Sequence, residues 1–394
     1  MTLSPVTTPT ASNDGSVKCF VAIELSKKSW QLGISLPHQD RMRVEIVSAG
    51  DGSGLLSRLE TLREQAERAV EQPVEVVTCY EAGYDGFWLH RLMTGYGITS
   101  YVFDPASLLV NRRARRAKTD RLDLKQLLRS LKAYDRGERD MVSVVCVPSL
   151  EDEDAKQLHR ERRRLVNERV QHTNCIKGLC ALHGVYDFEP ERARRFERLE
   201  ALRTYEGEPF PSRLQAELRR QLERLELVMR MIAELNAECR ALAISLMQSH
   251  PNADKIARLA QLKGMGPIFS AVLVGEVFYR AFDNRRQVAA YAGLAPSPFA
   301  SGGMERDQGI SKAGNALVRT TMIEAAWVWL RHQPDSALAR WFTDRVGTLK
   351  GRPRRINIVA LARKLLIALW RYAETGLVPT GARLKSDKTA KPAA

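Results

Sequence analysis

The stretch VKCFVAIELSKKSWQLGIS, residues 17–35, decides the fold of the first part of the chain. Two runs rich in β-branched and aromatic residues, KCFVAIEL and SWQLGISL, are separated by the short polar segment SKK. A connection this short between two β-type runs predicts a hairpin. MRVEIVSA, residues 42–49, is a candidate third strand.

Helix and strand signals alternate in the next part of the chain. In SGLLSRLETLREQAERAV, residues 53–70, apolar residues recur at three- and four-residue steps, as they do in an amphipathic helix. PVEVVTCYE, residues 73–81, and GITSYVFDP, residues 97–105, are β-type runs. Three strands, a helix, a strand, a helix and a strand is an order found in compact α/β nucleases. We therefore expect an α/β domain over residues 17–148.

The remainder of the chain is expected to be mostly helical. Between residues 214 and 246 leucines and other apolar residues advance by threes and fours, which predicts a long coiled-coil-like helix within a helical segment, residues 149–250. Its apolar stripe needs a partner, either the helix at residues 151–182 folded back or another protomer. A mostly α-helical domain is expected over residues 251–378. Residues 1–16 and 379–394 lack apolar periodicity and are expected to be a disordered arm and a disordered basic tail.

Composition narrows the functional class. The 394 residues include 61 Lys and Arg against 46 Asp and Glu, a net charge of +15, and 44% are hydrophobic. These are globular proportions, and the positive excess favours a polyanionic partner, with nucleic acid the first to consider. No apolar run is long enough for a transmembrane helix, the start is not a signal peptide, and six scattered cysteines form no disulfide framework. We therefore expect a cytoplasmic protein with no membrane partner.

Four carboxylates stand where predicted strands end or a helix begins: Glu24, Glu81, Asp120 and Asp123. A spacing of three puts the two aspartates on one helix face. Metal-dependent phosphoryl transfer needs several such oxygens around one or two divalent ions. The alternative is that they are ordinary surface acids, with Asp120 capping a helix. A cluster of cations directly before Asp120 could bind a phosphate backbone. These cations are Arg112, Arg113, Arg115, Arg116 and Lys118.

Two glycine-containing stretches of the C-terminal part could contact nucleic acid. Gly264 and Gly266 in LKGMGPIFSAVLVGEV resemble a helix-hairpin-helix turn, whose backbone N–H groups approach a phosphate. An αα-hairpin without a ligand is the alternative. Further on, Ser301 precedes two glycines, and Arg306 and Lys312 follow. Such a serine has an accessible hydroxyl, which favours a nucleophile beside a phosphate. Here the alternative is a flexible Gly/Ser loop.

Several motifs together resemble one family, the DEDD transposases of insertion sequences, which are related to Piv-type DNA invertases and in many members guided by a bridge RNA. VAIELSKKSW is similar to the family's opening motif, YEAGYDGFWL to its second acidic motif, and RRAKTDRLDLKQL to its D-x-x-D helix. LKGMGPIFSAVLVGEV, FDNRRQVAAYAGLAPS and SGGMERDQGISKAGNALVR resemble its C-terminal transposase domain.

The resemblance implies an N-terminal domain of the RuvC type with the RNase H fold. It implies that Glu24, Glu81, Asp120 and Asp123 bind Mg²⁺, or Mn²⁺, and that Ser301 attacks a DNA phosphodiester. It also implies DNA, a structured guide RNA and a homo-oligomer, a dimer or tetramer, as partners. Glu24 stands where the family usually has Asp. The function expected is DNA transposition or site-specific recombination. The alternatives are a nuclease or junction resolvase in which water attacks, and a catalytically impaired nucleic-acid-binding protein.

Overall fold

The computed structural model describes residues 16–39, 41–108, 120–301 and 304–385. By its internal contacts the chain divides into two compact units, Met1–Ser149 and Leu150–Ala394. None of the described helices is both long enough and apolar enough to cross a membrane.

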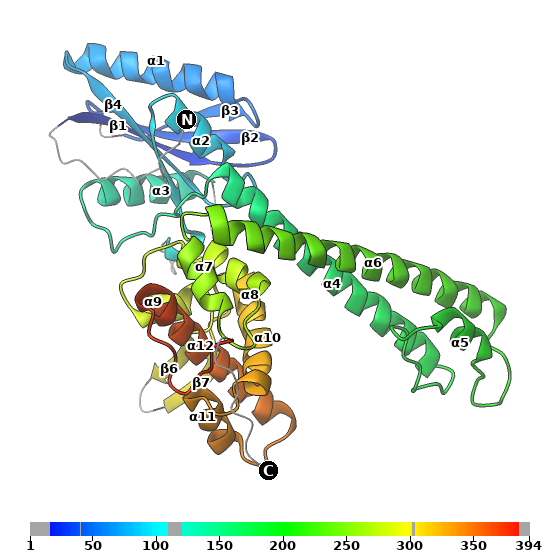
Figure 1. The fold of residues 1–394 in the computed structure, drawn as a ribbon. Helices are drawn as coiled ribbons and strands as arrows, with labels where there is room; N and C mark the ends of the chain where they lie inside the picture. Colours follow the sequence, from blue (N-terminus) through cyan, green and yellow to red (C-terminus); the bar gives the residue numbers. More distant parts are fainter. Residues whose placement is uncertain (1–15, 40, 109–119, 302–303, 386–394) are drawn as a thin grey trace. The chain divides into compact units, whose positions relative to one another are not determined.

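The N-terminal unit is built on a five-stranded mixed sheet with the strand order β3-β2-β1-β4-β5 (Figure 1). Its strands are β1 (Val17–Glu24), β2 (Ser29–Ser35), β3 (Arg43–Ser48), β4 (Val74–Glu81) and β5 (Thr99–Phe103). The first three pair antiparallel, whereas β4 pairs parallel with both β1 and β5. The predicted hairpin, the third strand and the α/β class are confirmed.

Helices cover both faces of this sheet. The helices are α1 (Gly52–Val70), α2 (Trp88–Gly95) and α3 (Asp120–Asp135), and the short turn η1 (Pro105–Ser107) follows β5. Because strand side chains alternate between faces, Val21 and Ile23 of β1 pack with α1 and α2, whereas Ala22 packs with α3. The sheet is therefore buried on both sides, and α3 is alone on its face among the described helices of this unit (Figure 1).

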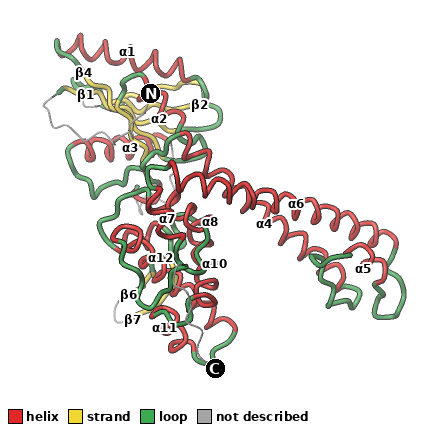
Figure 2. The backbone as a smooth tube through the Cα atoms, in the orientation of Figure 1, coloured by secondary structure: helices red, strands yellow, loops and turns green. Residues whose placement is uncertain are grey.

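Two long antiparallel helices, α4 (Leu150–Ala181) and α6 (Ser212–Ser249), pack along each other (Figure 2). The short helix α5 (Arg195–Ala201) lies at the end of the pair where α4 finishes and α6 begins. Leu165 of α4 is buried with Val228, Ile232 and Leu235 of α6. The partner of the predicted apolar stripe is thus the helix from the same chain, folded back.

The rest of the second unit is a helical domain that also carries a β-hairpin. Its elements are α7 (Ala253–Ala260), α8 (Pro267–Leu273), the π-helical turn η3 (Val274–Phe278), α9 (Arg285–Tyr291), β6 (Pro296–Ser301), β7 (Met304–Ile310), α10 (Ala316–His332), α11 (Ala337–Val346) and α12 (Gly351–Thr375). Trp329, Phe278 and Leu365 lie in its core. The hairpin of β6 and β7 was not expected from the sequence, because Pro296 and Pro298 argue against a strand.

The predicted disorder of residues 379–394 is wrong for the residues up to Lys385. Leu384 forms a β-bridge with Leu262, and the side-chain amide of Gln333 donates to the carbonyl of Arg383 at 2.9 Å. The Lys385 ammonium donates to the carbonyl of Met265 at 3.1 Å. Backbone pairing holds this segment although it has little apolar surface, so its polar composition misled the prediction. Residues 386–394 lie outside the described residues, as does the predicted arm up to residue 15.

Burial of His159 on α4 predicts a pH-dependent stability. Burial, and secondarily the charge of Arg162, lowers the pKa of His159 to about 4 from 6.5. The unfolded chain therefore binds more protons than the folded one between these values, so stability is present above pH 6.5 and falls as the pH drops toward 4. We expect His159 to contribute a loss of about 2 kcal/mol between pH 7 and 5.

Thermal unfolding of the wild type and of His159→Gln at several pH values measures this loss. Because glutamine cannot be protonated, the variant should lose less stability over the same range. His38→Gln, at an exposed histidine, is the matched control and should follow the wild type. Identical pH profiles for all three proteins would contradict the assignment.

Candidate functional site

Two of the four predicted acids end neighbouring parallel strands. Glu24 is the last residue of β1 and Glu81 the last of β4. In the ladder between these strands Ile23 lies opposite Tyr80, so Glu24 and Glu81 come next at the same level. The sequence reasoning placed both acids at strand ends. The pairing of β1 with β4 brings them to the same edge of the sheet.

Both acids belong to the sheet face that α3 covers. Ala22 of β1 and Cys79 of β4 are buried in the core beneath α3. Strand side chains alternate, so residues two positions further along face the same way. Glu24 is partly buried and Glu81 is exposed, so both are less buried than Ala22 and Cys79 of the same strands.

Helix α3 runs antiparallel to β1 and therefore begins at this same edge. Near its end, Asp135 forms an ion pair of 2.8 Å with Lys18, at the start of β1. Near its beginning, Leu124 packs over Gly33, where a Cβ atom would come within 3.2 Å of the leucine Cβ. Gly33 pairs with Ala22, two residues before Glu24. The partly buried Asp123, one residue before Leu124, is thereby held near the end of β1.

The donor chemistry of this edge fits a hard divalent cation, because carboxylate oxygens are the ligands that Mg²⁺ and Mn²⁺ prefer. Within the part of the chain that the structure describes, no three His, Cys, Asp or Glu side chains form a group that could hold a metal ion. Asp120 begins α3, but its side chain is outside the described set. The metal-binding tetrad therefore stays a prediction. The predicted phosphate strip also lies outside the described residues, namely Arg112, Arg113, Arg115, Arg116 and Lys118.

Ser301 lies at the tip of the hairpin in the second unit. It ends β6 and pairs with Met304, which begins β7. Arg306 pairs with Phe299 further down the hairpin. The side chains of Ser301 and Arg306 are outside the described set, as are the two glycines of the turn.

The SKAGN segment, residues 311–315, fastens the base of this hairpin. Lys312 has φ of +57°, its N–H donates to the carbonyl of Gly293 at 3.2 Å, and its side chain is exposed. The guanidinium of Arg319 donates to the Lys312 carbonyl at 3.0 Å. Gly314 has φ of +121°, and a Cβ there would come within 2.4 Å of the Tyr291 carbonyl oxygen. Only glycine fits this position.

Asn315 joins this segment to a buried carboxylate. Its Oδ1 accepts from the N–H groups of Leu317 and Val318 and caps α10. Its Nδ2 donates to Oε2 of Glu276 at 2.7 Å. Glu276 is 4% exposed in η3, and Arg160 of α4 lies 3.7 Å from its other carboxylate oxygen. Sequence reasoning missed Glu276, although one carboxylate inside the apolar run VLVGEV was a signal of a buried polar role.

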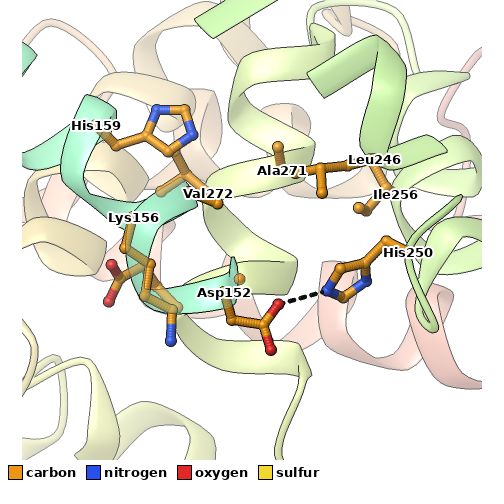
Figure 3. Close-up of a pocket in the computed structure, with 11 residues that line it drawn as sticks. Asp152, Lys156, His159, Leu246, His250, Ile256, Ala271 and Val272 are labelled. Carbon is orange, nitrogen blue, oxygen red and sulfur yellow. Dashed lines mark hydrogen bonds and ion pairs between the residues drawn. The ribbon is translucent and has the colours of Figure 1, made fainter. Parts of the chain in front are cut away.

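A small pocket lies beside Glu276. Its volume is about 20 Å³, which suits a single water molecule rather than an organic ligand. In Figure 3 a dashed line joins His250 and Asp152, two of the residues that line this pocket. The N–H of Asn252 donates to Nδ1 of His250 at 2.9 Å, so Nε2 carries the proton and donates to Asp152, also at 2.9 Å. The pair ties the start of α4 to the end of α6.

Gly264 and Gly266 form the turn between α7 and α8. Gly264 has φ of +82°, and a Cβ there would come within 2.9 Å of the His332 side chain. Gly266 precedes Pro267, the first residue of α8. Gly264 is therefore required for packing against α10, as in the αα-hairpin alternative. A phosphate contact at this turn stays a prediction.

Comparison with known proteins identifies the family. The sequence model of the "Transposase IS116/IS110/IS902 family" matches residues 256–340, the part that contains Glu276, the hairpin and the SKAGN segment. A putative transposase, y4rJ, of Sinorhizobium fredii is 46% identical over 385 residues, covering 96% of this chain and 97% of that protein. The chain belongs to the IS116/IS110/IS902 family of transposases.

Other proteins named as transposases are similar to this chain at lower identity. A probable family 20 transposase of Pseudomonas aeruginosa is 33% identical over 59% of this chain and 67% of its own length. The transposase for insertion sequence element IS1111A of Coxiella burnetii is 27% identical over 71% of this chain and 73% of its own length.

The close approach of Gly314 to the Tyr291 carbonyl predicts that a larger residue at position 314 destabilises this transposase. Gly314→Ala must adopt an unfavourable φ and also displace the Tyr291 carbonyl, so we expect a loss of about 3 kcal/mol or more in the free energy of unfolding. Gly309→Ala is the matched control, since φ there is +83° but no atom lies within 4 Å of a new Cβ. It should lose only about 1 kcal/mol. Thermal unfolding measures both, and equal losses would show that the close approach at Gly314 is unimportant.

Proposed function

We propose that this chain is a DNA transposase in which an acidic, metal-binding edge of the N-terminal sheet and the Ser301 hydroxyl together break and rejoin DNA strands. The observation that carries the proposal is the position of Glu24 and Glu81, which lie at one level on adjacent parallel strands. They belong to the sheet face that α3 covers, and the first turn of α3 contains Asp123. The transposase names of the relatives support DNA as the substrate.

The strand order supports assignment of the N-terminal unit to the RNase H fold, of the RuvC type. Three antiparallel strands followed by two parallel ones, in the order β3-β2-β1-β4-β5, match what that fold requires. In this assignment the acids of the first and fourth strands and of the following helix form one site.

The metal-binding part of the proposal assigns Mg²⁺, or Mn²⁺, to Glu24, Glu81, Asp120 and Asp123. When bound, such an ion lowers the pKa of an attacking hydroxyl and neutralises charge that develops on the phosphate. The carboxylates hold and orient the ion, and α3 fixes the distance between its own acids and the strand ends. Glu24 carries one methylene more than the aspartate usual in the family, so Glu24→Asp tests how closely this site depends on side-chain length.

The serine carries the covalent step. Its Oγ attacks phosphorus in line, an Oγ–P bond forms, the P–O bond to one strand breaks, and the serine proton ends on the departing strand oxygen. The phosphoserine link keeps the energy of the broken ester, so a hydroxyl of another strand can reverse the step and join a new end. Arg306 and Lys312 would hold the phosphate. The step requires the acids and Ser301 at one phosphate, from one copy or from two.

The proposal extends to the partners that the resemblance implies. They are a structured guide RNA and further copies of the chain, in a dimer or tetramer. Neither is needed to explain the strand chemistry, so each is tested separately from it.

Trapping of a protein–DNA adduct tests the nucleophile. Incubation of the transposase with supercoiled DNA carrying the element and its flanks should give an adduct that survives denaturing electrophoresis, and Ser301→Ala should abolish it. Ser297→Ala and Ser311→Ala, from the same hairpin region, are the matched controls and should retain it. An adduct that persists in Ser301→Ala would remove this serine from the role. Cleavage without any adduct would favour attack by water.

Substitution of the acids tests the metal site. Asp123→Asn and Glu81→Gln each remove one anionic ligand, so we expect strand cleavage to fall by about 10²–10³-fold, with DNA binding unchanged. Asp140→Asn, an exposed acid of the same unit, should cleave normally. Cleavage should require Mg²⁺ or Mn²⁺ and stop with a chelator. Full activity of Asp123→Asn would contradict the proposed site, whereas binding without cleavage by the wild type would favour an impaired binding protein.

A further inference from the structure

The helices at the C-terminal end of the described chain carry an unusual excess of cations. Between residues 340 and 364 there are eight cations and one acid, Asp344. The cations are Arg340, Arg345, Lys350, Arg352, Arg354, Arg355, Arg363 and Lys364. Within the described part of the chain none of them forms an ion pair with a carboxylate. Exposed arginines elsewhere do, and Arg63 and Arg68 of α1 pair with Glu60 and Glu64.

Three of these cations lie over tryptophan rings instead. The Arg354 guanidinium lies 5.4 Å from the ring centroid of Trp327, which is 41% exposed. The Lys364 ammonium and the Arg345 guanidinium lie 4.7 and 5.9 Å from the centroid of Trp341. A cation held over an aromatic ring keeps its charge and most of its N–H donors available to a ligand.

A further contact holds Arg345 of α11 against α12. Arg345 donates to Oδ1 of Asn357 at 2.9 Å, and Nδ2 of Asn357 donates to the Pro353 carbonyl at 3.0 Å. On α12, Arg354, Asn357 and Lys364 follow at steps of three and seven, so they share one side of the helix. From Arg354 to Lys364 the helix rises about 15 Å, which matches the axial rise of roughly four base pairs of DNA.

The start of α12 adds positive charge without compensation. Its first turn has no acidic residue and no side-chain cap, and it contains Arg352 and Arg354, with Arg355 directly after them. Cations are unfavourable near a helix N-terminus, and neighbouring like charges repel each other. This concentration of positive charge therefore destabilises the start of α12. A bound polyanion would neutralise the charge and remove the repulsion.

We infer that this surface binds the phosphate backbone of double-stranded DNA. We call it the basic face and define it by Trp327, Trp341, Arg345, Arg354 and Lys364, together with Arg352 and Arg355, which flank Arg354 at the exposed start of α12. The choice of DNA as the occupant rests on the proposed function. The basic face contains none of the acids and none of the hairpin residues that carry the proposed chemistry. Unpaired cations on ordered side chains contact phosphates, and the half-exposed tryptophans contact sugars, so binding is independent of sequence and weakened by salt.

The test compares two triple variants that lose the same charge. Arg345→Gln, Arg354→Gln and Lys364→Gln together remove the ring-stacked cations of the basic face. Arg63→Gln, Arg68→Gln and Arg219→Gln remove three exposed cations that are paired with glutamates. Binding of a labelled 30-base-pair DNA of random sequence is measured against salt concentration, with a chelator present so that cleavage plays no part.

We expect the basic-face variant to bind about 10–100-fold more weakly at 0.1 M salt, with the slope of log K against log salt smaller in magnitude by about 2–3. The control variant should stay within about twofold of the wild type. Equal effects of the two variants, or an unchanged slope, would overturn the inference. Loss of binding to a 30-base-pair RNA with DNA binding retained would also overturn it, in favour of RNA.

A second variant guards against misfolding. Arg352→Gln with Arg355→Gln changes only exposed side chains, so the fold should be retained. We expect a loss of about 3–10-fold in DNA affinity, with the melting temperature unchanged, and an unchanged affinity would count against the inference. Adduct formation through Ser301 is read in a separate assay, so failure of the serine chemistry and failure of the basic face are distinguishable.

Discussion

The packing of α3 across the N-terminal sheet is the constraint on which the proposed site depends. The ion pair between Lys18 and Asp135 holds one end of the helix at the start of β1, and the close contact of Leu124 with Gly33 holds the other end near Glu24. A larger residue at position 33 would lift the first turn of α3 from the sheet. Asp123 would then move away from the two strand-end acids, so Gly33, which carries no functional group, is required for the proposed arrangement of the acids.

The C-terminal unit uses a different kind of constraint, a buried polar network. Asn315 caps α10 and binds Glu276 with the same side chain, so the helix start and the π-helical turn are fixed together. Arg160 brings the charge of α4 to the same carboxylate. Burial of a carboxylate is costly unless it is paired, and each partner here belongs to a different segment. The network thus links α4, η3 and the start of α10 next to the base of the hairpin that carries Ser301.

Charge is distributed differently in the parts of this molecule. On α1, and in part on α6, exposed arginines form ion pairs with neighbouring glutamates. The first turn of α12 has no acid, and two cations of this helix, Arg354 and Lys364, lie over tryptophan rings. The location of the positive charge therefore says more about a binding surface than the net charge of +15 does. Residues 340–364, with eight cations and one acid, carry a large share of the excess.

The sequence alone determined the order of strands and helices, the long helix with its apolar stripe, and which acids end the strands, because these follow from local periodicity and turn residues. It could not show that α4 covers that stripe, that Glu24 and Glu81 share one level, or that residues 379–385 pair with the C-terminal domain. Nor did it reveal the hairpin carrying Ser301 or the buried Glu276. These features arise from pairing between segments far apart in the chain, and such pairing depends on register and packing, which local residue patterns do not specify.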